Sequence, residues 1–251
     1  MKLSDFHREE HFRFKLFDDS ATYTTIRCLK EEDLRSVWLI DIPERGLTTL
    51  KRWPISWKLR WKSLFKQSQP QRQISGAWKL LTAGINTPQP VTPVYRAGDF
   101  FQLEMPFIEG ATVFDLLNSG ESYSHAEQCL IARELGEIVR KLASTHLRHR
   151  DLKLENVVVK PANQVQQKPT LWLIDPVGIR NCLSPLTAIV YMLDRLAIQP
   201  IHERIPLPTS LQIICIRSAV NSIPRRQRKL LFQKLRKQLQ SSTRETGPLN
   251  D

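Results

Sequence analysis

The stretch HRDLKLEN, residues 149–156, decides how the rest of this sequence is interpreted. It follows a long amphipathic segment, 124–145, that we expect to be helical, and it precedes the apolar run 157–159, which is typical of a buried strand. Between these two elements it brings together an acid, a base and an amide, namely Asp151, Lys153 and Asn156. Such a group of side chains on a loop indicates either a catalytic site or a surface turn whose charges have no role.

The stretch is similar to the catalytic loop H-R-D-L-x-x-x-N of the protein kinases. This resemblance implies that Asp151 accepts the proton of an incoming hydroxyl group and that Asn156 binds a magnesium ion. Lys153 would lie beside the transferred phosphoryl group and neutralise charge on its oxygens. The number of matching positions favours the catalytic interpretation over a surface turn.

A second segment, LWLIDPVGIR at 171–180, has an apolar strand that ends at an acid, with a glycine three residues later. By similarity to the kinase D-F-G segment, Asp175 would bind magnesium that bridges the nucleotide phosphates. An aspartate and a glycine at this spacing are a weak signal alone, but they gain weight because they follow HRDLKLEN.

Two further pieces concern the nucleotide. Lys51 follows Leu-Thr-Thr-Leu at 47–50, and a lysine on the third strand of a kinase holds the α- and β-phosphates. The alternative is an ordinary lysine at the end of a strand. In the linker 105–110, Pro106 would offer a backbone carbonyl to the adenine edge, and Ile108 would offer an N–H.

The fold class that we expect is α+β, with two lobes and a protein-kinase-like arrangement. Period-two alternation predicts a β-rich N-lobe at 1–105, with strands over 12–16, 22–28, 37–42, 47–53 and 100–105, another near 94, and helices within 54–66 and over 71–83. After a hinge at 106–110, the pattern predicts a helical C-lobe at 111–241, with helices over 113–118, 124–145, 185–197, 210–221 and 224–240. Residues 242–251 read as a flexible tail.

The order of these segments resembles the lipopolysaccharide kinases, the Kdo and heptose kinases, over about residues 10–240. The similar features are LKRW at 50–53, AGINTPQPV at 83–91, MPFIEGATVFDLL at 105–117, HRDLKLEN and LIDPVGIR. The resemblance implies a protein-kinase-like fold, ATP and Mg2+ as cofactors, and transfer of the γ-phosphoryl group to a core-sugar hydroxyl. The acceptor would be an anionic glycolipid at the inner face of the cytoplasmic membrane.

The sequence departs from the kinase pattern at three places. The helix after Lys51 should carry a glutamate that pairs with this lysine, but no acid occurs between Gly46 and Gly98, and Ala77 occupies the expected position. The turn at 18–22 has no glycine. Pro176 and Val177 follow Asp175 where kinases have phenylalanine, and no A-P-E motif is present. The lost ion pair leaves Lys51 less firmly held.

The net charge of +12 predicts an anionic partner. Residues 54–66, PISWKLRWKSLFK, contain tryptophans and bases but no acid, so this helix would either lie on an anionic membrane or pack its tryptophans on the protein. The bases within 224–240 form either a solvated helix face or a second anionic contact. No nucleic-acid-binding motif is present, so a nucleic-acid partner is not expected.

The location that we expect is the cytoplasm, with peripheral attachment to the inner face of the cytoplasmic membrane as the further possibility. No secretory signal or membrane-spanning run is evident, and the four cysteines are too far apart to suggest a metal site. Three functions remain open: a sugar kinase, a kinase of protein hydroxyls, and a pseudokinase that binds ATP as a scaffold.

Overall fold

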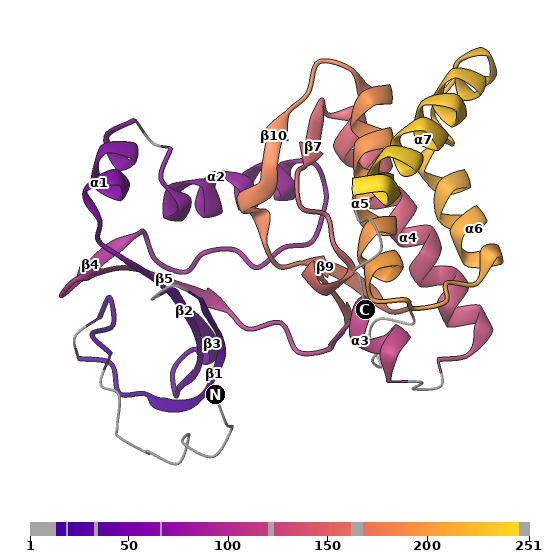
Figure 1. The fold of residues 1–251 in the computed structure, drawn as a ribbon. Coiled ribbons are helices and arrows are strands. Elements are labelled where there is room, and N and C mark those ends of the chain that lie inside the picture. Colours follow the sequence, from indigo (N-terminus) through magenta and orange to yellow (C-terminus); the bar gives the residue numbers. More distant parts are fainter. Residues whose placement is uncertain are drawn as a thin grey trace, which may run out of the picture. The chain divides into compact units, whose positions relative to one another are not determined.

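The computed structural model describes residues 14–18, 20–32, 35–65, 67–119, 123–161 and 168–245 (Figure 1). The chain divides into two compact units: unit 1 is Met1–Gln71 with Gln89–Phe107, and unit 2 is Arg72–Pro88 with Ile108–Asp251. The expected α+β class, with a β-rich N-terminal part and a helical C-terminal part, is confirmed. Residues 72–88 group with unit 2, although the expected N-lobe covered 1–105.

Unit 1 is built on a five-stranded antiparallel sheet with the strand order β1-β2-β3-β5-β4. The strands are β1 (Thr24–Glu32), β2 (Arg35–Ile42), β3 (Gly46–Pro54), β4 (Tyr95–Ala97) and β5 (Phe100–Pro106). Alternate apolar residues such as Ile40 and Ile42 point into one core together with Leu50. The strand expected over 12–16 is absent from its described residues 14–16, but Phe14 and Leu16 are buried in this core. Phe12 lies outside the described residues.

Helix α1 (Trp57–Leu64) begins at Ser56, whose hydroxyl accepts a hydrogen bond from the N–H of Leu59. None of its residues is buried. Trp57 is 68% exposed and Trp61 is 57% exposed, so the alternative in which this helix packs its tryptophans on the protein is not observed. Its bases therefore share an accessible helix with exposed aromatic side chains.

Unit 2 contains most of the helices. They are α2 (Gln69–Thr82), which belongs to unit 2 from Arg72 onward, α3 (Val113–Asn118), α4 (His125–Ser144), α5 (Pro185–His202), α6 (Thr209–Ala219) and α7 (Arg225–Glu245). Their apolar faces share one core, which includes Leu142, Leu152 and Met192. The start of α4 is fixed by a capping box between Ser124 and Glu127. The α7 helix extends to Glu245, within the range expected to be a tail, and 246–251 lie outside the described residues.

The helix α2 ends in a way that ties the following segment to unit 2. Gly84 adopts a φ of +68°, and the N–H of Ile85 donates to the carbonyl of Leu80 at 2.9 Å. Two residues later, the hydroxyl of Thr87 donates to the carbonyl of Leu173 at 2.6 Å. This segment is therefore anchored to the strand that precedes the predicted metal-binding aspartate.

Two small sheets in unit 2 position the polar loops. One is a three-stranded antiparallel sheet, β6 (Ala111–Thr112), β8 (Val157–Lys160) and β9 (Thr170–Leu173). The other pairs β7 (Leu147–His149) with β10 (Ile179–Asn181). Two 3-10 turns, η2 (Leu154–Asn156) and η3 (Pro176–Gly178), lead into β8 and β10. Over the described residues, no helix is both long and apolar enough to span a membrane.

Candidate functional site

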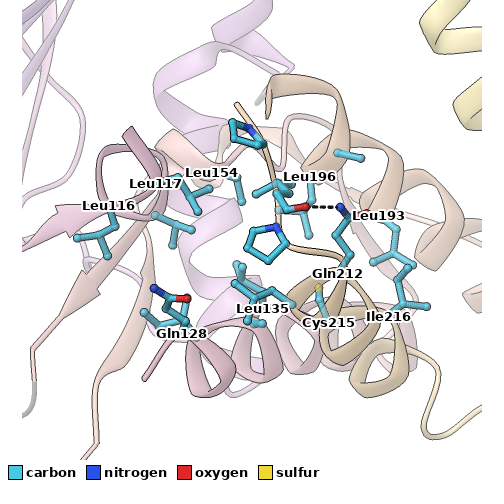
Figure 2. A pocket seen from close by; sticks show the side chains of 18 of the residues that line it. Leu116, Leu117, Gln128, Leu135, Leu154, Leu193, Leu196, Gln212, Cys215 and Ile216 are labelled. Atoms are coloured by element: carbon cyan, nitrogen blue, oxygen red, sulfur yellow. Dashed lines mark hydrogen bonds between the residues drawn. The ribbon is translucent and has the colours of Figure 1, made fainter. Parts of the chain in front are cut away.

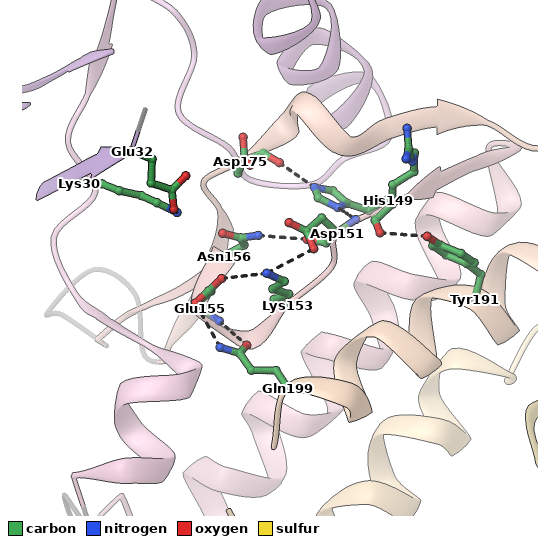
Figure 3. A network of polar contacts seen from close by, with 11 residues as sticks. Lys30, Glu32, His149, Asp151, Lys153, Glu155, Asn156, Asp175, Tyr191 and Gln199 are labelled. Atoms are coloured by element: carbon green, nitrogen blue, oxygen red, sulfur yellow. Dashed lines mark hydrogen bonds and ion pairs between the residues drawn. The ribbon is translucent and has the colours of Figure 1, made fainter. Parts of the chain in front are cut away.

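His149 joins the two predicted catalytic segments within unit 2. Its side chain is fully buried; Nδ1 accepts a hydrogen bond from the N–H of Asp151 at 3.1 Å, and Nε2 donates to the main-chain carbonyl of Asp175 at 2.7 Å (Figure 3). These two bonds require a neutral ring with its proton on Nε2. Burial lowers the pKa of His149, although the nearby charges of Asp175 and Asp151 act in the opposite direction. His149 is therefore a neutral clamp between HRDLKLEN and the DPVG turn.

The glycine of the DPVG turn, Gly178, lies against the buried ring of His149. A Cβ atom at this position would lie 2.7 Å from Cε1 of His149, so any side chain would displace the buried ring. The carbonyl of Gly178 also accepts a hydrogen bond from the N–H of Arg150 at 2.9 Å. The glycine is thus required by the close approach of the two segments.

The side chains of Asp151 and Lys153 lie at the solvent-accessible edge of the loop. The side chain of Asp151 is 47% exposed and that of Lys153 is 41% exposed, and Lys153 Nζ lies 3.7 Å from Asp151 Oδ1. Lys153 Nζ is also 3.4 Å from a carboxylate oxygen of Glu155. The predicted base and the predicted phosphate-neutralising lysine are therefore neighbours, and both are accessible to solvent.

Asn156 lies beside the strand that leads to Asp175. Its Nδ2 donates to the main-chain carbonyl of Asp151 at 3.0 Å, and its own carbonyl accepts a hydrogen bond from the N–H of Ile174 at 3.0 Å. The first bond fixes the amide orientation, and Oδ1 points away from Asp151 in Figure 3. Asn156 and Asp175 are thus brought close together by the pairing of β8 and β9.

The donor set suits a magnesium ion that is shared with a nucleotide. Oxygen atoms of Asn156 and Asp175 are the ligand type that Mg2+ prefers, and Mg2+ is commonly held by one or two carboxylates together with phosphate oxygens. No group of three or more His, Cys, Asp or Glu side chains able to hold a metal occurs in the described part of the chain. Asn156 and Asp175 would supply two oxygen ligands of this kind.

Helix α5 supports the loop through residues that the sequence did not single out. The hydroxyl of Tyr191 donates to the carbonyl of Arg150 at 3.1 Å. The side chain of Gln199 contacts Glu155 twice, because it accepts from the Glu155 N–H at 3.3 Å and donates to its carboxylate at 3.2 Å (Figure 3). These contacts join positions more than forty residues apart, so no local sequence pattern could have revealed them.

Helix α2 packs directly on the DPVG turn and lacks the expected acid. A Cβ atom on Gly76 would lie 2.0 Å from the carbonyl oxygen of Pro176, and the neighbouring Ala77 is fully buried. Arg72 lies one helical turn before Gly76. Burial and the charge of Arg150 lower the pKa of its guanidinium, whereas the carboxylate charge of Asp175 acts in the opposite direction. The charge near Asp175 on this helix is thus basic, whereas a kinase has a glutamate on the corresponding helix.

The nucleotide-binding residues predicted near the hinge are divided between the units. Lys51 and Pro106 belong to unit 1, whereas Ile108 is among the residues of unit 2. Lys51 lies within β3, paired with Val37 and Leu103, and is not at the end of a strand as the sequence suggested. Pro106 pairs with Thr48 at the end of β5. Their roles toward a nucleotide stay predictions.

Unit 2 also contains an apolar cavity of about 530 Å³ (Figure 2). Its wall includes Leu116, Leu154, Leu193 and Ile216. Cys215 also lines it, and burial raises the pKa of this thiol to about 12, so it is not a nucleophile at neutral pH. The cavity has none of the charged groups that the HRDLKLEN loop carries.

The chain matches no family model and no curated protein.

Proposed function

We propose that this protein is an ATP-dependent kinase, which transfers the γ-phosphoryl group to a sugar hydroxyl of a lipopolysaccharide-core-type glycolipid. The observation that carries the proposal is the His149 clamp, since its two hydrogen bonds connect the candidate base Asp151 to the candidate metal ligand Asp175. A buried contact between two motifs in the order that kinases require is not expected of a surface turn.

In the proposed reaction, Asp151 accepts the proton of the sugar hydroxyl as its oxygen attacks the γ-phosphorus and ADP leaves. Lys153 lies beside Asp151 and would stabilise negative charge on the transferred group. Asn156 and Asp175 would hold Mg2+, which neutralises phosphate charge when bound. Lys51 would contact the α- and β-phosphates, and the backbone of Pro106 and Ile108 would bind the adenine edge.

The nature of the acceptor is inferred from charge and from the resemblance of the sequence to the lipopolysaccharide kinases. A net charge of +12 favours an anionic substrate. The exposed tryptophans and bases of α1 suit contact with the anionic membrane in which a glycolipid resides. The protein would then act in the cytoplasm, peripherally bound at the inner membrane face.

The deciding experiment measures transfer from labelled Mg-ATP to purified core glycolipid, to a protein substrate and to buffer alone. We expect labelled glycolipid with the wild-type protein and with Asp99→Asn, an exposed turn residue that serves as the matched control. Asp151→Ala should lose the activity. Wild-type transfer no greater than that of Asp151→Ala would end the enzyme proposal, and transfer to protein alone would indicate a kinase of protein hydroxyls.

A second candidate function is an ATP-binding scaffold without activity. It is favoured by Ala77, which offers no carboxylate from α2 where an active kinase positions its phosphate-binding lysine. The same assay separates the two functions, because a scaffold would bind ATP with measurable affinity but label none of the acceptors.

A further inference from the structure

A basic pocket of about 510 Å³ lies in unit 2, between α2 and the two-stranded sheet of β7 and β10. Four bases line it, with Ser75 and Asn181 as neutral polar neighbours: Lys79, Arg148, Arg150 and Arg180. None of the described residues that line the pocket is acidic. This concentration of positive charge is separate from the side chains of Asp151, Asn156 and Asp175, which do not line it.

The sheet itself forces two of these bases together. Arg148 on β7 and Arg180 on β10 are directly opposite each other in the antiparallel register. Like charges that face each other across two strands are destabilising. A short sheet that keeps two arginines in this relation, with two more bases close by, is better explained by an anion that binds between them than by solvation alone.

Several contacts hold the bases in place before any ligand arrives. An Nη atom of Arg180 donates to the carbonyls of Val177, at 3.2 Å, and Ile179, at 2.8 Å. Lys79 Nζ donates to Asn181 Oδ1 at 3.0 Å. The guanidinium of Arg148 lies 4.9 Å from the centroid of the Tyr191 ring. Side chains positioned in advance lose less entropy when a ligand binds.

The guanidinium groups also retain unused donors and unrelieved charge. Among the described residues, Arg148 Nε is buried and has no hydrogen-bond partner. Burial lowers the pKa of Arg180, and the charges of Arg72 and Arg150 lower it further. Buried donors that lack partners are costly, and an oxyanion that accepts from them would remove that cost.

We propose that this pocket binds the phosphate group of a small phosphorylated ligand, at a site distinct from the kinase centre. A phosphate monoester carries nearly two negative charges and three acceptor oxygens, which matches paired arginines better than a carboxylate does. The volume lies within the roughly 300–1,000 Å³ of small-molecule pockets and so leaves room for the group that carries the phosphate. The site does not depend on the proposed kinase activity.

The test is isothermal titration calorimetry without ATP or Mg2+, using inorganic phosphate and a hexose 6-phosphate as separate probes. Both should bind the wild-type protein, and the sugar phosphate should bind more tightly because it fills more of the pocket. The double variant Arg148→Gln/Arg180→Gln should weaken both by roughly tenfold or more, since it removes charge-assisted hydrogen bonds. Arg217→Gln, an exposed base on α6, is the matched control and should bind like the wild type.

Thermal denaturation guards against loss of binding by misfolding. Without phosphate, the double variant is expected to be at least as stable as the wild type, because the facing charges are gone. The single variant Arg148→Lys, which keeps the charge but loses the guanidinium donors, should bind more weakly than the wild type and more tightly than the double variant. Absence of binding to the wild type, equal binding to the double variant, or binding of a phosphorylated peptide but of neither small probe would overturn the proposal.

Discussion

His149 Nε2 donates a 2.7 Å hydrogen bond to the main-chain carbonyl of Asp175, a residue 26 positions further along the chain. The same ring accepts the N–H of Asp151. The histidine thus fixes the backbone on both sides of the candidate phosphoryl-transfer site while its side chain is fully buried. Its role in the structure is to position other residues, and this role depends on its neutral state.

The neutral state of His149 predicts a pH dependence of stability. Because its folded pKa lies below the unfolded value of about 6.5, the unfolded chain binds the proton more readily. The stabilisation is therefore complete above pH 6.5 and is lost as the pH falls below it, at up to about 1.4 kcal/mol per pH unit. Urea denaturation between pH 5 and 8 checks this. His149→Gln should be less stable at pH 7.5 and show a flatter profile; an equally steep profile would assign the effect to other groups.

Asn156→Ala should lower kinase activity and raise the concentration of Mg2+ needed for half-maximal rate. The substitution removes the candidate metal oxygen together with the bond to the carbonyl of Asp151. The measurement is a magnesium titration of the transfer assay at fixed ATP. Asn118→Ala, at the exposed end of α3, is the matched control. An unchanged magnesium requirement in Asn156→Ala would remove this residue from the metal site.

Arg45→Ala should destabilise unit 1 by roughly 3 kcal/mol, the low end for breaking a buried ion pair, because the arginine is 28% exposed. Arg45 contacts the fully buried carboxylate of Glu104 at 2.8 Å, and the variant would leave that charge with neutral donors only. Lys30→Ala breaks a pair in which both side chains are at least 60% exposed and should cost under about 1 kcal/mol. Chemical denaturation of both variants measures the difference, and equal losses would contradict it.

Gly76→Ala should destabilise the protein although alanine is the better helix former. The gain in helix propensity is about 1 kcal/mol, whereas overpacking costs roughly 1–3 kcal/mol. Overpacking should win here, because the new Cβ would meet a backbone oxygen of Pro176 at 2.0 Å. Ser75→Ala, exposed on the same helix, serves as the control in thermal denaturation. A stabilised Gly76→Ala would mean that α2 does not pack this tightly.

The helix α1 should bind vesicles that contain anionic lipid. Trp57→Ser/Trp61→Ser should reduce vesicle binding by roughly tenfold or more, because each buried aromatic side chain contributes about 1.5 kcal/mol or more. The measurement is cosedimentation with anionic and with neutral vesicles at two salt concentrations. Trp78→Ser on α2, an equally exposed tryptophan, should bind like the wild type. Equal binding of the two tryptophan variants would assign the contact to another surface.

Much of the fold was predictable because its signals are local. Helix α4 carries its own capping box, the strand β3 covers the range predicted as a strand, and HRDLKLEN contains the motif in one stretch. The alternation at 12–16 was misleading because Phe14 and Leu16 are buried as loop residues that cover the core.

The rest of the site depends on contacts between distant residues. Strands β7 and β10 have three residues each, too few to show a period, so the opposition of Arg148 and Arg180 could not be foreseen. Glu104 lies in a mostly apolar strand. A carboxylate at such a position indicates a buried partner of opposite charge, and the structure shows that this partner is Arg45. The sequence could not identify that partner.

The bond between Thr87 and Leu173 has a consequence for the order in which the chain can acquire its structure. Residues 72–88 belong to unit 2, but the ribosome makes them before the second segment of unit 1, Gln89–Phe107, and long before β9. During synthesis, the apolar face of α2 stays exposed to solvent until the chain up to and beyond residue 173 has left the ribosome, because its packing partners in unit 2 are made later. If the chain were expressed as two fragments divided at residue 107, α2 would be separated from the rest of unit 2. Neither fragment should then fold unless the other is present in the same cell.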